Sequence, residues 1–255
     1  MKKHILIIAT AIVSMALASC HISIDEDLLF SETVKGDGNV ATREYTITQF
    51  DELSCSLPAI VYFTVGDACT CTVSVDENLY DYIEVKVKDG ELLMRRPQAH
   101  KRVDLDATKF VINVTAPSLD EVNFAGSGEL NFLSPLNTEE LEVNVAGSAN
   151  VYFNDAANVD HLELNVAGSG RIVIEKGSIR ELEADIAGSG TIKSYAQVQD
   201  MDVNVAGSGD MMAVVNGTLD YSIAGSGNIR YFGDAKVDGK VLGSGSITRV
   251  ENLPF

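Results

Sequence analysis

The tetrapeptide Ala-Gly-Ser-Gly recurs along the second half of this chain at nearly constant spacing. Copies begin at Ala125, Ala146, Ala167, Ala187, Ala206 and Ala224; Ala149 ends the second copy, and a Leu242-Gly243-Ser244-Gly245 variant comes last. Successive copies are 21, 21, 20, 19, 18 and 18 residues apart. A period near 20 residues sustained over seven copies predicts a solenoid, in which each repeat stacks on the previous one.

Stretches of alternating apolar and polar residues flank each copy of the motif, as at 141–145 and 150–153. Such alternation, with many β-branched residues, predicts a strand on each side. A shorter third segment supplies one apolar residue per unit, namely Leu136, Val159, Ile179 and Val198. We therefore predict an all-β, right-handed parallel β-helix with coils of about 20 residues, and with turns at Asn154-Asp155, Asn216-Gly217 and Gly233-Asp234.

The motif glycines follow from the parity of the predicted strands. Leu141, Val143 and Val145 face inward, and the same parity places Gly147 and Ala149 inward as well. We expect these positions to lie at a bend where only a hydrogen atom or a methyl group fits. A phosphate-binding glycine loop is excluded because a strand, and not a helix, follows every copy.

The chain divides into four segments. Residues 1–19 are a predicted lipoprotein signal, 20–40 a lipidated tether, 41–118 an irregular N-terminal β region, and 119–255 the repetitive solenoid, with the last two forming one continuous domain. Residues 53–63 resemble a degraded repeat unit, and further strands are expected at 71–75, 83–87, 91–95 and 110–114. We expect these strands to cap the stack, since an uncovered stack of strands invites aggregation.

The N-terminal segment has the form of an export signal. Lys2 and Lys3 precede an apolar run from Ile5 to about Leu17, which is shorter than the roughly 20 residues of a membrane-spanning helix. The run ends in Leu17-Ala18-Ser19-Cys20, which resembles the bacterial lipobox. We predict lipidation of Cys20 and an outer-membrane lipoprotein of the cell envelope, facing either the periplasm or the surface. The alternative is an ordinary secretory signal with an incidental cysteine.

The net charge restricts the partners. It is −18 for the whole chain and −20 once Lys2 and Lys3 leave with the signal. A chain this acidic repels nucleic acids and anionic headgroups. We expect no nucleic-acid partner; the membrane is reached through the lipid, and the ligand is a cation, a basic protein or a neutral glycan. The oligomeric state stays open.

Three cysteines remain after Cys20. Cys55, Cys69 and Cys71 alternate with polar neighbours, and a period of two predicts that all three lie on the inner face of a strand as buried thiols. A disulfide from Cys55 to Cys69 or Cys71 is the alternative in an oxidising compartment. No histidine lies near them in the sequence, which argues against a metal site.

Several short motifs occur in a characteristic order across residues 45–250. They are Phe50-Asp51-Glu52-Leu53, 60–67, Lys88-Asp89-Gly90-Glu91-Leu92, Ala116-Pro117-Ser118-Leu119 and the glycine-serine repeats. In these motifs the chain resembles the head GIN domain family, whose members are described as auto-transporter adhesins. The resemblance implies an exported β-solenoid and an adhesive role, with no catalytic motif to transfer. The lipobox departs from the autotransporter pattern, so we expect this chain not to be an autotransporter itself.

Outward positions of the predicted strands form two columns. The first contains Glu121, Glu142, Glu163, Glu183, Asp202, Asp220 and Asp238, and the second contains Asn123, Asn144, Asn165, Asp185, Asn204, Ser222 and Lys240. Rungs about 4.8 Å apart allow asparagine amides to bond along the axis, whereas stacked carboxylates repel one another. We predict either a solvated face that opposes aggregation, or a binding face for divalent cations or a cation-bridged glycan. Calcium takes about 6 to 8 oxygens, more than a flat column offers, so no tight metal site is predicted.

The sequence shows no pattern typical of an active site. Acids recur evenly in every unit, whereas a glycosidase needs two carboxylates that face one bond. His161 begins a predicted strand and is interpreted as a surface residue. We therefore predict a lipid-anchored binding or adhesion module, without catalytic activity and without a cofactor. The alternatives are an envelope scaffold or stress-related protein and, third, a polysaccharide-active β-helix enzyme.

Overall fold

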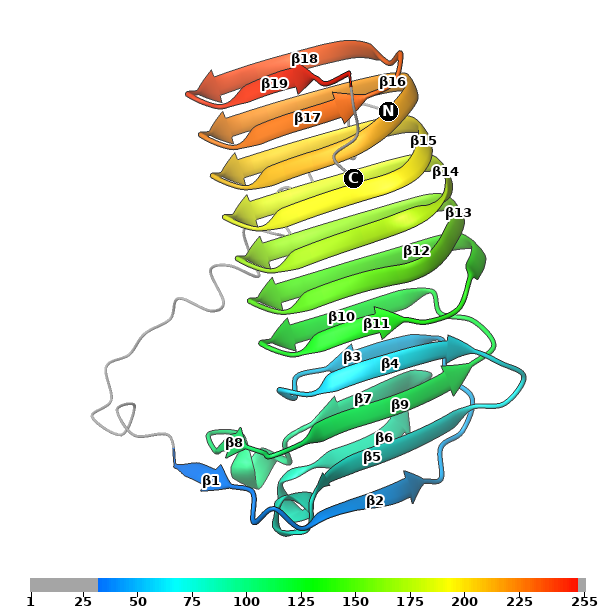
Figure 1. The fold of residues 1–255 in the computed structure, drawn as a ribbon, viewed down its shortest axis with the longest axis vertical. Helices are drawn as coiled ribbons and strands as arrows, with labels where there is room; N and C mark the ends of the chain where they lie inside the picture. The colour runs from blue at the N-terminus through cyan, green and yellow to red at the C-terminus, as the bar shows by residue number, and fades with distance from the viewer. Residues whose placement is uncertain (1–31, 252–255) are drawn as a thin grey trace.

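The computed structural model describes residues 32–251, which form an elongated β-solenoid with a broader N-terminal end (Figure 1). The predicted signal, Cys20 and residues 252–255 lie outside the described residues. Within residues 32–251, no helix is long and apolar enough to cross a membrane.

The regular part of the solenoid consists of strands stacked in parallel register. They are β10 (Glu121–Gly126), β11 (Glu129–Phe132), β12 (Leu136–Gly147), β13 (Asn150–Gly168), β14 (Arg171–Gly188), β15 (Thr191–Gly207), β16 (Asp210–Gly225), β17 (Asn228–Phe232), β18 (Lys236–Gly243) and β19 (Ser246–Arg249). Each of β13 to β16 runs from one motif through the return segment to the next motif. The prediction of a parallel β-solenoid with coils of about 20 residues is confirmed.

The return segment differs from the prediction in two details. Asn154-Asp155 and Asn216-Gly217 lie within continuous strands and are not separate turns. The apolar column of this segment is also offset in one coil, because Leu136 pairs with Ala157, whereas Thr138 pairs with Val159. From Val159 onward the column continues as predicted through Ile179 and Val198.

One inward column of the core changes from aromatic to small side chains. Phe63 meets Phe132 edge-to-face, with ring centroids 5.4 Å apart, and Phe132 stacks on Phe153 at 4.4 Å. Ile174 and Ser194 continue that column. Register shifts between successive coils occur just after this column. Over the same coils the repeats shorten from 21 to 18 residues.

The N-terminal region continues the stack and then covers its end (Figure 1). It contains β1 (Thr33–Lys35), β2 (Val40–Tyr45), β3 (Glu52–Cys55), β4 (Ile60–Val65), β5 (Thr70–Asp76), β6 (Glu84–Lys88), β7 (Glu91–Arg95), β8 (Asp104–Asp106) and β9 (Phe110–Ala116), with short 3-10 helices η2 (Glu77–Tyr82) and η3 (Gln98–His100). β3 and β4 pair in parallel with β10 and β11, so the predicted degraded repeat is a coil of the solenoid. β7 and β9 add the next rung, and the antiparallel strands β5 and β2 lie beyond β9.

Part of the segment interpreted as a tether is folded. β1 pairs in parallel with β8, and the carboxylate of Asp76 fixes the connection to β2. That carboxylate accepts hydrogen bonds from the backbone N–H groups of Gly38 and Thr108, each at 2.8 Å, and from the Thr108 hydroxyl at 2.6 Å. These bonds, led by the one from the Thr108 side chain, lower the pKa of Asp76. Any tether therefore ends before Thr33.

The prediction that the first glycine of each motif faces the core is wrong. This glycine has a positive φ in every copy, from 88° at Gly147 to 137° at Gly243. A Cβ atom on Gly188 would lie 2.5 Å from the carbonyl oxygen of Gly168 in the preceding coil. The N–H of Ser189 donates to that same oxygen at 2.8 Å. The first glycine thus lets the chain turn while the backbone ladder continues around the corner.

The second glycine of the motif does face the core. Gly170, Gly190 and Gly209 are buried, and a Cβ atom on Gly190 would lie 2.4 Å from Cγ1 of Val166. Ala149 occupies the equivalent position in the second copy and is fully buried. At this position the predicted inward corner, with room only for hydrogen or methyl, is confirmed.

The cysteines are only partly as predicted. Cys55 and Cys71 are buried, whereas Cys69 is half-exposed and packs against the edge of the core, so the prediction of buried thiols holds for two of the three. All three are free. Burial raises the pKa of both Cys55 and Cys71 to about 12, which keeps these thiols protonated and unreactive.

Candidate functional site: the acidic face

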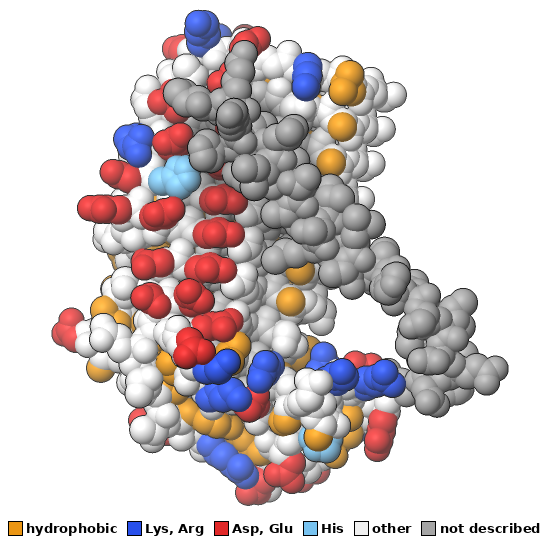
Figure 2. Space-filling model, turned by 180° about the vertical axis from the view of Figure 1, so that it is seen from behind, with side chains coloured by type: hydrophobic (Ala, Val, Ile, Leu, Met, Phe, Trp, Pro, Cys, Tyr) orange, Lys and Arg blue, Asp and Glu red, His pale blue; other side chains and the backbone are white. Residues whose placement is uncertain are grey.

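The first outward column of carboxylates forms in the register that the repeat predicts. Glu121 pairs with Glu142, which pairs with Glu163, and the series continues through Glu183, Asp202, Asp220 and Asp238. We call this set the acidic column. Asp and Glu side chains gather along this side of the stack in Figure 2. Parallel pairing places equivalent residues directly above one another, so the column is a direct consequence of the repeat.

Two carboxylates that the sequence analysis missed extend the acidic column. Glu52 of β3 pairs with Glu121, and Glu91 of β7 pairs with Glu52. In both cases an acid directly precedes an inward leucine, Leu53 or Leu92, as in the repeat units. That local pattern was a usable signal, but only the fold shows that these strands join the same stack.

The second column is an asparagine ladder over its first three rungs. Nδ2 of Asn144 donates to Oδ1 of Asn123 at 3.1 Å, and Nδ2 of Asn165 donates to Oδ1 of Asn144 at 3.0 Å. Each of these amides also donates to the neighbouring carboxylate on its own strand, for example Asn144 to Glu142 at 2.8 Å. The amides therefore tie the two columns together and orient the carboxylates.

The ladder is interrupted at Asp185. Asp185 pairs in register with Asn165, and the Oδ1 atoms of both residues are buried without a hydrogen-bond partner. A carboxylate has no proton to donate to the amide oxygen below it, so two acceptors remain unsatisfied. On the other side, the Asn204 side chain donates a hydrogen bond to Asp185. This rung is the weak point of the second column.

The carboxylates near this rung are hard to ionise. Desolvation, followed by repulsion from Glu183, Asp185 and Asp220, raises the pKa of Asp202 to about 6. Desolvation is also the main cause of the raised pKa of Glu183 and of Asp185. Negative charge on these carboxylates therefore lowers the stability of the fold. Protonation or cation binding, which neutralises that charge, should raise the stability.

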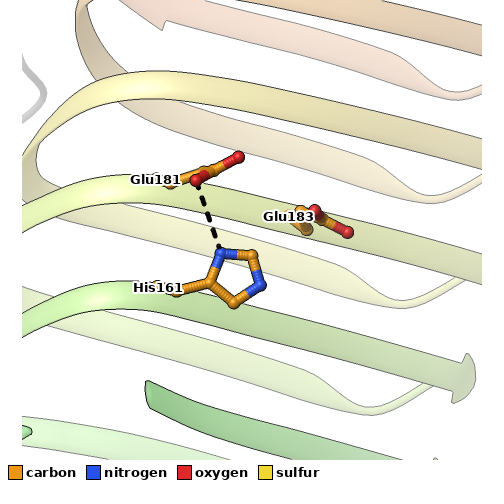
Figure 3. Close-up of side chains that lie close together, drawn as sticks. All are labelled: His161, Glu181 and Glu183. Atoms are coloured by element: carbon orange, nitrogen blue, oxygen red, sulfur yellow. Dashed lines mark ion pairs between the residues drawn. The ribbon is translucent and has the colours of Figure 1, made fainter. Parts of the chain in front are cut away.

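A third outward column lies two residues before the acidic column on each strand, on the side of the return segment. It contains Glu140, His161, Glu181, Asp200, Thr218 and Lys236 in register. His161 on β13 faces Glu181 and Glu183 on β14 (Figure 3), and one ligand atom from each lies within 4.8 Å of the others. His161, which its sequence position predicts to be a surface residue, is half-buried among these carboxylates. The missed signal was that His161 lies at the same repeat position as Glu140 and Glu181.

A polar groove runs across the return segments next to this column. It has a volume of about 510 Å³, and Val159, Ile179 and Val198, which belong to the core, lie buried beneath it. Its rims carry Asn158, Asp160, Ser178, Arg180, Gln197, Gln199 and Asn216. Because the lining residues come from β13 to β16, the groove follows the solenoid axis. The sequence analysis did not predict this groove, although its polar rims repeat with the coil.

These features define the chain as a β-solenoid of the binding-protein class. The parallel stack presents charged and amide ladders to solvent beside a polar groove, and solenoids typically bind their partners through such regular surfaces. Residues 49–235 match the family described as "Putative auto-transporter adhesin, head GIN domain". The chain belongs to this family, as its sequence motifs indicated.

Solved structures support the same assignment. A protein described as a putative lipid binding protein from Parabacteroides distasonis is 30% identical, with a TM-score of 0.77, and the match covers 86% of this chain and all of that one. A putative adhesin from the same organism is 27% identical with a TM-score of 0.71, and one from Parabacteroides merdae is 25% identical with a TM-score of 0.67, both with the same coverage. No curated protein matches the chain.

Proposed function

We propose that this protein is a lipid-anchored, non-catalytic adhesion module of the cell envelope, which holds a glycan chain in the groove beside the acidic face. The observation that carries the proposal is the shape and chemistry of that groove. Its lining residues come from four successive coils, and its rims offer amide and hydroxyl groups. A repeating ligand presents equivalent hydroxyl groups at intervals, and a repeating scaffold is suited to meet them.

The amides of the rim are already positioned by one another. Nδ2 of Asn158 donates to Oδ1 of Asn137 at 2.8 Å, and Nδ2 of Asn216 donates to Oε1 of Gln197 at 2.9 Å. Such pairing limits side-chain motion, so less rotamer entropy is lost when a ligand binds. The strongly negative face next to the groove disfavours anionic polymers, which leaves neutral or basic glycans as the preferred class.

The solved relative described as lipid binding suggests a second ligand class. The groove is less suited to acyl chains, because polar side chains form its rims and the three aliphatic residues beneath it are buried in the core. The anchoring lipid of the proposal is the one predicted at Cys20, which is covalent and does not need this groove.

The enzyme alternative depends on the raised pKa of Asp202. A carboxyl group that stays protonated near neutral pH can act as a general acid. However, Asp202 and its neighbours are stacked side by side in one column and do not face each other across a bond. The glycan-binding experiment described below therefore also tests whether any bound glycan is cleaved.

The proposal is tested with a glycan array and with extracellular-matrix proteins, using the full-length protein extracted from membranes. The double variant Gln197→Ala/Gln199→Ala removes two rim amides and should weaken glycan binding about tenfold or more, since each lost hydrogen bond contributes about 1 kcal/mol. Asn113→Ala, an exposed asparagine on β9 away from the groove, is the matched control. Binding that is equally strong in the double variant, or absent from both panels, would contradict the proposal.

A further inference from the structure

A histidine and two glutamates converge at one place on the acidic face (Figure 3). His161 and Glu181 are paired in register on adjacent coils, and Glu183 lies two residues further along the same face of β14. Nδ1 of His161 is 3.7 Å from Oε2 of Glu181, which is too long for a hydrogen bond. All three side chains are half-buried, so the fold restricts their positions.

We propose that His161, Glu181 and Glu183 form a binding site for a divalent transition-metal ion of the Zn²⁺ type. Tetrahedral bonds of about 2.0 to 2.2 Å place two ligand atoms roughly 3.4 Å apart. The 3.7 Å separation of His161 and Glu181 therefore needs only a small side-chain adjustment, and Glu183, whose ligand atom lies within 4.8 Å of the other two, must move closer when the ion binds. One neutral imidazole and two carboxylates balance the charge of the ion and leave a fourth position open. This proposal is independent of the proposed glycan function.

The presence of an imidazole ligand selects the class of ion. Calcium and magnesium prefer oxygen ligands, whereas an imidazole combined with carboxylates suits zinc and its transition-metal neighbours. A flat surface offers too few ligand atoms for calcium, but three are enough for zinc. Zinc sites with exchangeable ligands typically have three protein ligands and one open position.

Two neighbouring residues affect the site. Glu163 pairs in register with Glu183 and is held by a 2.8 Å hydrogen bond from Asn165, so it can stabilise the bound cation from an adjacent position. Arg180 competes for Glu181, with Nη1 3.4 Å from Oε2. Arg180 is exposed, and such ion pairs are weak. We therefore expect the metal ion to displace this contact.

The simpler account is that His161 acts only as a positive charge that relieves repulsion among the acids. The two accounts differ in what a lysine would do at this position. His161→Lys keeps a positive charge beside Glu181 and Glu183 but removes the imidazole ligand. A metal site is lost in this variant, whereas a purely electrostatic role is preserved.

The experiment is a Zn²⁺ titration of the full-length protein by calorimetry, in millimolar calcium and magnesium to occupy diffuse acidic sites. The protein carries no histidine tag, and all variants are made on a Cys69→Ser background to remove the half-exposed thiol. We expect one zinc ion per chain, and at least tenfold weaker binding for His161→Lys and for Glu181→Gln. Glu121→Gln, which changes the same acidic column two coils away, should bind like the unmodified site.

Thermal melts without metal establish that each variant is folded. Two variants with different chemistry are used so that the test still stands if one of them fails to fold. The proposal is overturned if His161→Lys and Glu181→Gln retain the affinity of the unmodified site. It is also overturned if no stoichiometric binding survives the competing calcium and magnesium. Equal loss in Glu121→Gln would show that the ion binds the column as a whole, which likewise rules out this site.

Discussion

The first glycine of each motif combines two constraints on a single residue. Its φ is positive, and the place where a Cβ atom would lie is occupied by a carbonyl oxygen of the preceding coil. That carbonyl also accepts the ladder bond from the following serine, as Gly168 does from Ser189. The position cannot relax without breaking the ladder, so we expect it to be the most sensitive residue of the coil.

Gly188→Val should therefore destabilise the fold by about 3 kcal/mol or more, since positive φ and overpacking each cost about 1 to 3 kcal/mol. Gly168→Val should behave in the same way. Ser169→Ala changes an exposed side chain of the same motif and should stay within about 0.5 kcal/mol of the unmodified protein. Denaturant melts of the three variants provide the comparison; similar midpoints for all three would show that this account of the corner is wrong.

At the scale of single elements, β14 interrupts a ladder that the strands on either side could continue. Asn123, Asn144 and Asn165 bond in series, and then Asp185 places an acceptor against an acceptor. An amide at this position would donate to Asn165 and still accept from Asn204. At this position an asparagine amide can donate a hydrogen bond to the residue in the preceding coil and stabilise the stack. An aspartate carboxylate has no proton to donate and leaves that acceptor unpaired.

Asp185→Asn should raise the stability at pH 7 by about 1 kcal/mol, the usual contribution of one restored hydrogen bond. The reverse change, Asn144→Asp, creates a second interruption and should lower the stability by a similar amount. The gain from Asp185→Asn should shrink in acid, because a protonated Asp185 can itself donate to Asn165. A lower melting temperature for Asp185→Asn at pH 7 would contradict the ladder argument.

At the scale of the whole molecule, the carboxylates of the first two outward columns make the stability of this protein depend on pH in an unusual direction. The pKa values of Glu52, Glu183, Asp185 and Asp202 are raised in the folded state, with desolvation as the first cause in each case. A group with a raised folded pKa contributes stability below its unfolded pKa, and that contribution is lost as the pH rises through the folded pKa. Groups with a lowered pKa, such as Asp76, have the opposite effect: their stabilising contribution is lost as the pH falls, but only in stronger acid.

We therefore expect the melting temperature to rise by several degrees as the pH falls from 7.5 to about 5, at matched ionic strength. The pKa of about 6 for Asp202 places its contribution in this window. Asp202→Asn should raise the melting temperature at pH 7.5 and reduce the dependence on pH. Differential scanning calorimetry checks both statements, and a steady fall in melting temperature over the same range would oppose them.

The attachment to the membrane is also a property of the whole molecule. Cys20 lies outside the described residues, and its lipidation is a prediction from Leu17-Ala18-Ser19-Cys20 alone. Cys20→Ala should release the protein from the membrane fraction and abolish the acyl mass on its mature N-terminus, since two or more acyl chains account for stable anchoring. Mass spectrometry of both fractions is the measurement, and an unmodified protein that stays in the membrane would refute the prediction.

The repeat alone was sufficient to predict the solenoid and the registered columns. Alternation assigns each side chain to the core or to solvent, and a constant period aligns equivalent residues when coils stack. Both properties are local, so Glu142, Glu163 and Glu183 could be placed above one another, and Asn144 on Asn165, from spacing alone. The same local pattern indicated the strands of the N-terminal region.

Tertiary structure decided what depends on distant pairing or on departures from ideal strand geometry. β3 and β7 join the acidic column only because the chain leaves the stack after β4, adds β7 and β9 on one side of the β3–β4 coil, and then continues on the other side at β10. Parity failed only at Gly147, where a positive φ turns the chain, and the two-residue alternation resumes with the same parity at Ala149. Only the stacking of β14 on β13 brings His161 to Glu181 and Glu183. The polar groove likewise exists only where four successive return segments lie side by side, since no single coil contains enough of its wall.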